Sequence, residues 1–427
     1  MTLKINPRKL IHTERGRLWL SQFHPMDQEL ASAVANNLTL VSHNEFERGL
    51  TKLLTQVSDN IDGTVALFAM REVAYHKVEV REFGQSFEVD RPAPYFENAQ
   101  EADNGNSVVP LSPTADIGSE GRIASIIRQF CRRDKAKFLN HPTIESMREK
   151  RCDAVIFVDD LIGTGSRAMQ FLSSFWAEKT IVSWHSFGWL KFHIAAYSGT
   201  DKGISLAESH KSKPEVHVYR DIPTFYSLPW SEERKEEVFS LCRKYGKRAN
   251  KKRKHMWLGY KKSMCSLVFE HGCPNNVPGI LVEENGEWTG LFPDRIVEDS
   301  TNSIFPSEIS EKFSVEHIHN VGQKRLAESK KLARRGELGL LILTVLALIA
   351  KSKRKKSTLC FATGFNNEEC ERVLSKCINW GFITAQIRIT SAGLAELKGA
   401  RSEGRMKGSV PDKGTEMYYP KALRKTV

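Results

Sequence analysis

Residues that could bind a phosphorylated sugar stand together in one stretch, residues 155–167, which reads VIFVDDLIGTGSR. Two adjacent carboxylates, Asp159 and Asp160, follow an apolar run, and a short turn of glycine and hydroxyl residues comes next. That turn consists of Gly163, Thr164, Gly165 and Ser166. Its backbone N–H groups and hydroxyls, with the N-terminus of a following helix, can hold a phosphate. The carboxylates would repel a phosphate, but they suit the hydroxyls of an attached sugar or a positive charge that develops on its ring.

The elements around this stretch must place it at the edge of a sheet. Residues 154–158 (AVIFV) form a continuous apolar run, which is typical of a strand buried on both faces of a parallel sheet. Ligands of open α/β sheets bind at the carboxyl ends of such strands. The hydrophobic pattern predicts further strands at residues 64–69, 191–197, 215–219 and 266–270. It predicts helices at residues 42–57 and from residue 119. This alternation predicts an α/β domain with a mainly parallel sheet.

The stretch at residues 155–167 resembles the signature with which type I phosphoribosyltransferases (PRTases) bind phosphoribosyl pyrophosphate (PRPP). The resemblance implies that Asp159 and Asp160 hold the ribose hydroxyls and that Gly163 to Ser166 hold the 5′-phosphate. Arg167 stands where that family usually has a second threonine, and its charge can still meet the phosphate. Mg²⁺ is expected to arrive on the phosphates of the substrate, and we predict no metal ligands within the protein. The alternative interpretation is a purely structural strand, turn and helix.

A pyrophosphate loop is implied by the same resemblance, after an earlier strand. Arg71 follows the predicted strand 64–69 and is the candidate to neutralise pyrophosphate, although an arginine in this position is often a surface ion pair. Glu120, near the start of the next helix, is a further candidate. Residues 267–278, continuing to Arg295, resemble the closing segment of PRTase-like domains from bacterial conflict systems.

The charge of the chain is concentrated towards its C-terminus. The net charge is +12, of which residues 321–427 carry +13 and the first 320 residues carry −1. Such asymmetry is typical of proteins that bind nucleic acid, although a basic face can also serve solubility alone. Between residues 243 and 262, ten of the 20 residues are Lys or Arg, and we interpret this run as a solvated helix face or a second nucleic-acid surface.

No segment of the sequence predicts a membrane or an oxidising compartment. The longest apolar run, residues 338–350, is too short to cross a bilayer, and the first 20 residues lack the apolar core of a signal peptide. The eight cysteines show no CxxC pair and no zinc-ligand spacing, so they are expected to be buried and reduced. These features predict a cytoplasmic protein.

The C-terminal region is predicted to contain helices at 338–350, from 357, at 366–380 and from 391, with a hairpin at 382–390. This arrangement resembles the winged helix-turn-helix (wHTH), whose recognition helix would be residues 366–380. Candidate base contacts are Asn366, Asn367, Arg372, Ser375 and Lys376. Candidate phosphate contacts are Lys353, Arg354, Lys355, Lys356 and Arg388. Winged helices also serve as protein-docking modules, and that alternative stays open.

The predicted order is an N-terminal extension (1–40), a PRTase-like α/β domain (41–320), a basic linker (321–335), a wHTH domain (336–400) and a basic tail (401–427). This order resembles the ribosyltransferase/DNA-binding proteins encoded beside a reverse transcriptase in bacterial retrons. The resemblance implies an antiviral (anti-phage) effector that works with a reverse transcriptase and its RNA-linked DNA. Two alternatives are a non-catalytic, PRPP-sensing transcription regulator and a scaffold.

Overall fold

The computed structural model describes residues 10–82, 85–97, 99–100, 102, 106–109, 119–298, 304–305, 336–363 and 367–402. The chain forms two compact units. One comprises Met1–Lys312 with Lys355–Glu371, and the other comprises Phe313–Arg354 with Arg372–Val427. Among the described residues, no helix combines the length and the apolar composition needed to cross a bilayer.

A five-stranded sheet forms the centre of the larger unit, with strand order β5-β2-β6-β7-β8 and every neighbouring pair parallel. The strands are β2 (Thr64–Ala69), β5 (Phe138–Asn140), β6 (Cys152–Ile162), β7 (Lys191–Gly199) and β8 (Glu215–Asp221). The predicted parallel α/β fold is therefore confirmed. β6 is longer than expected, because the ladder continues past the apolar run and pairs Asp159 with Ala196 and Ile162 with Gly199.

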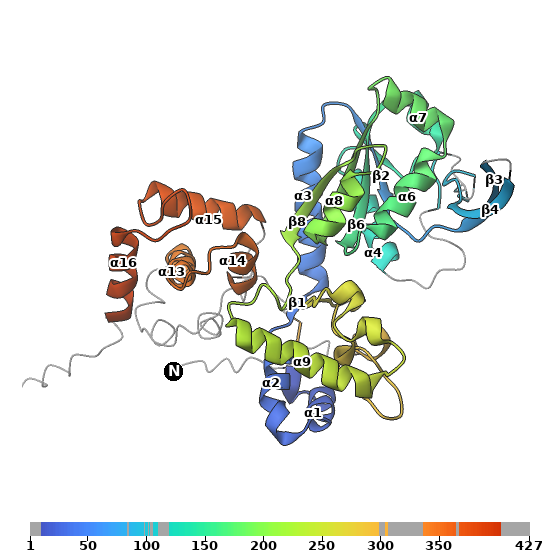
Figure 1. Ribbon diagram of the computed structural model, residues 1–427. Coiled ribbons are helices and arrows are strands. Elements are labelled where there is room, and N and C mark those ends of the chain that lie inside the picture. The colour runs from blue at the N-terminus through green and yellow to red at the C-terminus, as the bar shows by residue number, and fades with distance from the viewer. Residues whose placement is uncertain are drawn as a thin grey trace, which may run out of the picture. The chain divides into compact units, whose positions relative to one another are not determined.

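Helices cover both faces of this sheet (Figure 1). One face packs against α3 (His43–Asp59) and α4 (Ser119–Cys131), whose apolar positions recur at helical spacing and are buried. The other face packs against α5 (Ile144–Glu149), α6 (Ser166–Trp176), α7 (Lys179–Ser186) and α8 (Asp201–Glu208). Burial of β2 and β6 on both sides explains why their sequences are continuously apolar.

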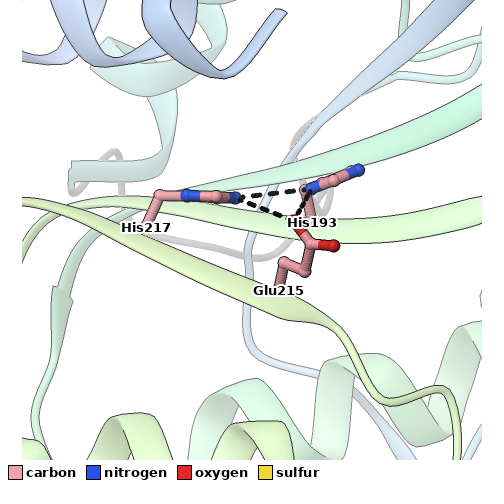
Figure 2. A group of neighbouring side chains, drawn as sticks. All are labelled: His193, Glu215 and His217. Carbon is pink, nitrogen blue, oxygen red and sulfur yellow. Dashed lines mark hydrogen bonds and ion pairs between the residues drawn. The ribbon is translucent and has the colours of Figure 1, made fainter. Parts of the chain in front are cut away.

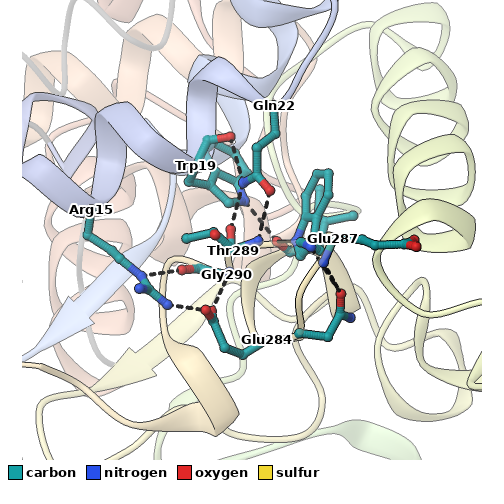
Figure 3. Close-up of polar contacts among 10 residues, drawn as sticks. Arg15, Trp19, Gln22, Glu284, Glu287, Thr289 and Gly290 are labelled. Atoms are coloured by element: carbon teal, nitrogen blue, oxygen red, sulfur yellow. Dashed lines mark hydrogen bonds and ion pairs between the residues drawn. The ribbon is translucent and has the colours of Figure 1, made fainter.

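A second layer of the larger unit joins the beginning of the chain to residues 222–292. It contains α1 (Glu14–Ser21), α2 (Pro25–Asn36), α9 (Glu232–Ala249) and the short parallel pair of β1 (Thr39–Val41) and β9 (Leu267–Phe269). Figure 3 shows α1 bonded to the segment after β9. Gln22 and Thr289 exchange two hydrogen bonds of 2.8 Å, and Arg15 pairs with Glu284.

The hairpin of β3 (Tyr75–Glu82) and β4 (Gln85–Pro92) was not predicted from the sequence. Most of its side chains are exposed, but Val78 and Val80 alternate with charged residues and lie opposite Val89 and Phe87, so the period-two signal of a strand is present in the sequence. Residues 95–118 were expected to form a long surface loop. Their described part is irregular, but Tyr95 and Val108 are buried in the core.

The C-terminal region contains α13 (Gly336–Ala350), α14 (Lys356–Thr363), α15 (Asn367–Asn379) and α16 (Ser391–Ser402). These confirm the predicted helices, and the inward positions Cys370, Val373 and Cys377 of α15 are buried as expected. The predicted hairpin is reduced to one antiparallel bridge between Ile383 and Ile389. The expected turn at Gly364 lies outside the described residues.

Candidate functional site

The acidic pair lies at the carboxyl end of β6, directly before the turn that begins α6. The Asp159 side chain is 2% exposed and that of Asp160 is 15% exposed. Gly165 has φ +78°, a conformation that favours glycine, and a Cβ there would lie 2.5 Å from the carbonyl oxygen of Gly203. A Cβ on Gly163 would lie 2.7 Å from Oδ1 of Asn276. Gly165 is therefore required by its backbone conformation and by the neighbouring backbone, whereas a side chain at 163 would have to displace that of Asn276.

The hydroxyls of the turn lie within reach of one another. Thr164 Oγ1 donates to Ser166 Oγ at 3.1 Å and accepts from the backbone N–H of Ser166 at 3.4 Å, while the N-cap residue of α6, Gly165, has no side chain to cap the helix. Thr200 Oγ1 donates to the carbonyl oxygen of Gly163 at 2.5 Å, which anchors the turn to the start of α8. The turn thus presents hydroxyls and the N–H groups of a helix N-terminus at the edge of the sheet, as a phosphate site needs.

Arg167, in the first turn of α6, points back at the acidic pair. Its Nη2 lies 2.5 Å from Oδ1 of Asp159 and 2.9 Å from Oδ1 of Asp160. The backbone N–H of Asp160 also donates to Oδ1 of Asp159, at 2.9 Å. In this structure one guanidinium therefore bridges the two carboxylates that were predicted to hold ribose.

The two carboxyls differ in pKa because their charged partners differ. Burial raises the pKa of Asp159 to about 8, with the charge of Asp160 acting in the same direction and Arg167 opposing it. Burial also acts to raise the pKa of Asp160, but His271 and Arg167 outweigh it and hold that pKa well below its ordinary value. Near neutral pH the pair therefore carries one proton and one negative charge, which balances Arg167.

This asymmetry predicts how stability depends on pH. Between about pH 4 and pH 8, Asp159 is protonated in the folded chain and ionised in the unfolded chain, so unfolding releases a proton. The contribution of Asp159 to the free energy of unfolding should then fall as the pH rises, at a limit of about 1.4 kcal/mol per pH unit. Buried histidines such as His141 and His210, whose pKa values burial lowers to about 3 and about 4, contribute in the opposite direction. Urea unfolding at pH 5 and pH 8 measures the change. The free energy of unfolding of Asp159→Asn minus that of the wild type should therefore rise from pH 5 to pH 8, and a difference that stays constant would contradict the raised pKa of Asp159.

Arg71 and Glu120 lie at the same edge of the sheet. Arg71 follows the end of β2, and the last residue of that strand, Ala69, pairs with Val158 of β6. The guanidinium of Arg71 lies 4.9 Å from the centre of the Tyr95 ring. Burial raises the pKa of Glu120, while the charges of Arg167 and Arg71 lower it. Glu120 is thus within electrostatic reach of both arginines, and the structure brings these predicted residues together.

A cleft of about 430 Å³ opens beside the acidic pair and was not predicted. It is lined by His43, Glu47, Arg122, Ser125, Ile126, Gln129 and His271. His271 Nε2 lies 3.8 Å from Oδ2 of Asp160, and His43 Nε2 lies 3.1 Å from Nη2 of Arg122. Burial and the charge of Arg122 lower the pKa of His43, which keeps its imidazole neutral. Both histidines also carry buried ring nitrogens without a hydrogen-bond partner.

The candidate nucleic-acid contacts are placed as follows. Arg354, Lys355, Arg372, Ser375 and Arg388 are exposed, and Lys353 and Lys376 are half-buried. Lys356 pairs with Glu371 at 2.6 Å. Asn366 lies outside the described residues, and only the backbone of Asn367 is described.

Two aromatic residues of the basic run at residues 243–262, Tyr245 and Trp257, have structural roles. The hydroxyl of Tyr245 donates to Asp27 at 2.7 Å, and Trp257 Nε1 donates to the carbonyl oxygen of Asn250 at 2.9 Å. Tyr245 is buried, so its ring does not form a stacking platform for bases. This supports the interpretation of the run as a solvated face.

Comparison with known protein families gives two matches. The model of the family described as PRTase-CE matches residues 17–293. The model described as wHTH-PRTase associated matches residues 343–425. A search of curated proteins found no match. The first match includes the acidic pair, the turn, Arg71 and His271, and the second includes every candidate nucleic-acid contact.

Proposed function

Since the chain belongs to the PRTase-CE family, we propose that its larger unit makes or breaks the C1′ glycosidic bond of a ribose 5-phosphate donor, PRPP or NAD or another nucleotide. The observation that carries this proposal is the succession of a buried acidic pair, a glycine- and hydroxyl-rich turn and a helix N-terminus at one edge of the sheet. The turn would bind the 5′-phosphate, which would place the ribose over Asp159 and Asp160.

The charge of the acidic pair matches the chemistry at C1′. Cleavage of the glycosidic bond leaves positive charge on the ribose ring, and the ionised Asp160 can stabilise it in a site screened from water. Arg167 bridges both carboxylates, so the ribose hydroxyls must take its place. Arg167 can then turn towards the phosphate that the donor brings.

Mg²⁺ belongs to the donor in this proposal. Oδ1 of each carboxylate is already bonded to Arg167, so the pair is not a ready set of free oxygens for an ion of its own. Mg²⁺ on the donor would supply charge to the departing pyrophosphate, and Arg71 would add its own charge from the end of β2.

The cleft beside His271 is the place for the second reactant, the acceptor or the departing base. It lies next to Asp160, on the side of α3 and α4. Because a guanidinium only donates, Nε2 of His43 accepts from Arg122, so the cations and amides that line the cleft, and not His43 as a base, are the groups that would meet the second reactant.

Isothermal titration calorimetry with PRPP and Mg²⁺ tests donor binding. We expect saturable binding of one PRPP per chain, and weaker binding of ribose 5-phosphate, which lacks the pyrophosphate that Arg71 would contact. Absence of binding by PRPP, NAD and nucleotides alike would contradict the proposed function.

We extend the proposal to the cell. The wHTH match and the basic C-terminal region support binding to nucleic acid, either duplex DNA or a DNA–RNA hybrid product. The order of the two matched regions supports a role as an anti-phage retron effector that works in the cytoplasm with a reverse transcriptase. Deleting that reverse transcriptase gene, where one neighbours this gene, should change the toxicity of the protein during phage infection.

The wHTH proposal predicts a defined loss of binding. Alanine at both Arg354 and Arg388, which are exposed before α14 and after α15, should weaken nucleic-acid binding. If both contact phosphates, the slope of log K against log salt should fall by about 2. Fluorescence anisotropy at several salt concentrations measures it. Lys398→Ala, an exposed cation on α16, is the matched control, and an equal effect there would contradict the assignment.

A second candidate function, a PRPP sensor without turnover, is favoured by the bridge from Arg167 to the acidic pair. A donor that displaces Arg167 would change the charge balance at the start of α6 without any bond being broken. A sensor would bind PRPP, return it intact and change its affinity for a defined duplex.

A further inference from the structure

Two histidines and a glutamate meet at the other end of the sheet, where β7 and β8 begin. His193 is the third residue of β7, and its register partner is Glu215, the first residue of β8. His217 lies two residues further along β8, so all three side chains project from the same face. His193 pairs on its other side with Ile156, three residues before Asp159, which separates this group from the acidic pair. Figure 2 shows the three side chains converging.

The distances between the three groups are too long for good hydrogen bonds. His193 Nδ1 lies 3.4 Å from His217 Nε2 and 3.6 Å from Oε2 of Glu215, and His217 Nε2 lies 3.8 Å from that same oxygen. Hydrogen bonds of this kind normally span about 2.7–3.2 Å. Mutual hydrogen bonding therefore does not explain why three lone-pair atoms face one another.

The same distances match a metal site. The centre of a triangle with these sides lies about 2.1 Å from each corner, which is the usual bond length from zinc to imidazole nitrogen and carboxylate oxygen. Two imidazoles and a carboxylate favour zinc and its neighbours over Mg²⁺ and Ca²⁺, which prefer oxygen ligands. The Glu215 side chain is 69% exposed, so an ion can enter from solvent and keep a position for water.

We propose that His193, Glu215 and His217 bind one zinc ion or a similar divalent transition-metal ion, with water as a further ligand. β8 is the edge strand of the five-stranded sheet, and the ion would fasten its first residues to β7. This site is separate from the Mg²⁺ that the donor would carry, and the proposal does not depend on the proposed function.

The test uses the full chain, stripped of metal with a chelator and titrated with Zn²⁺ by calorimetry. We expect one Zn²⁺ per chain, a rise in melting temperature with Zn²⁺, and no competition from millimolar Mg²⁺. Co²⁺ in place of Zn²⁺ should give the visible absorption of a tetrahedral site. No saturable binding, or displacement by Mg²⁺, would overturn the proposal.

Variants identify the ligands. Glu215→Gln and His217→Ala should each weaken Zn²⁺ binding at least about tenfold while leaving the melting temperature of the metal-free chain unchanged, since both side chains are partly exposed. His193→Ala removes a buried ring and is used only if it folds. His255→Ala, an exposed histidine elsewhere, should bind as the wild type does. Binding that is unchanged in His217→Ala and Glu215→Gln would place the ion elsewhere and refute the assignment.

Discussion

Asparagine at both 159 and 160 is expected to abolish turnover of the ribose donor, with a loss of about 10³-fold or more in kcat/KM. The double substitution keeps the size of both side chains but removes the negative charge that would face the ring as the glycosidic bond breaks. Preorganised charge of this kind commonly contributes about 10²–10³-fold per group. Release of pyrophosphate or of the base, followed by mass spectrometry, measures it.

The control is Asp153→Asn, on the same strand. Asp153 is exposed, and its Oδ2 accepts from the backbone N–H of Thr64 at 2.9 Å, a bond that an asparagine oxygen can keep. That variant should turn over at the wild-type rate. An unchanged rate in the Asp159→Asn/Asp160→Asn variant would remove the acidic pair from the mechanism.

Replacing Arg167 with threonine, the residue usual in type I PRTases at this position, is expected to destabilise the fold. Asp159 and Asp160 would then be buried together without their common cation. The cost should be about 1–3 kcal/mol, below the usual figure for a broken buried pair, because the Arg167 side chain is 34% exposed and Asp159 can stay protonated. Urea unfolding at pH 7 measures the change.

A double-mutant cycle isolates the bridge. Arg167→Thr in the Asp159→Asn/Asp160→Asn background should cost much less than in the wild type, since no buried charge is left unpaired. Equal costs in both backgrounds would show that Arg167 stabilises α6 by packing alone.

The central strands and their helices could be predicted because burial on both sides leaves a clear signal. β2 and the first half of β6 (residues 154–158) are continuous buried apolar runs, β7 has a shorter buried run at residues 194–197, and α3 has apolar residues at helical spacing. The hairpin of β3 and β4 was missed because it has no continuous apolar run, although Val78 and Val80 alternate with charged residues opposite Val89 and Phe87. The end of β6 was misplaced because charged side chains suggested a turn, whereas the backbone ladder continues through them.

The site was predicted from one local segment, to which the family resemblance added Arg71 and Glu120. Asp159 to Arg167 form one segment, and its order alone indicated a phosphate and a sugar. His43, Arg122 and His271 come from α3, α4 and the residue stretch after β9, and only tertiary packing brings them to the cleft. The bridge of Arg167 to both carboxylates likewise depends on rotamers that no local pattern specifies.

The most direct test of the central claim is a mass-spectrometric time course of PRPP, NAD and nucleotides with the purified chain and Mg²⁺. The wild type is predicted to consume one of these donors and release pyrophosphate or the free base, while the Asp159→Asn/Asp160→Asn variant leaves every donor intact. Donors that remain unchanged with the wild type, or that disappear equally with both proteins, would contradict catalysis by the acidic pair.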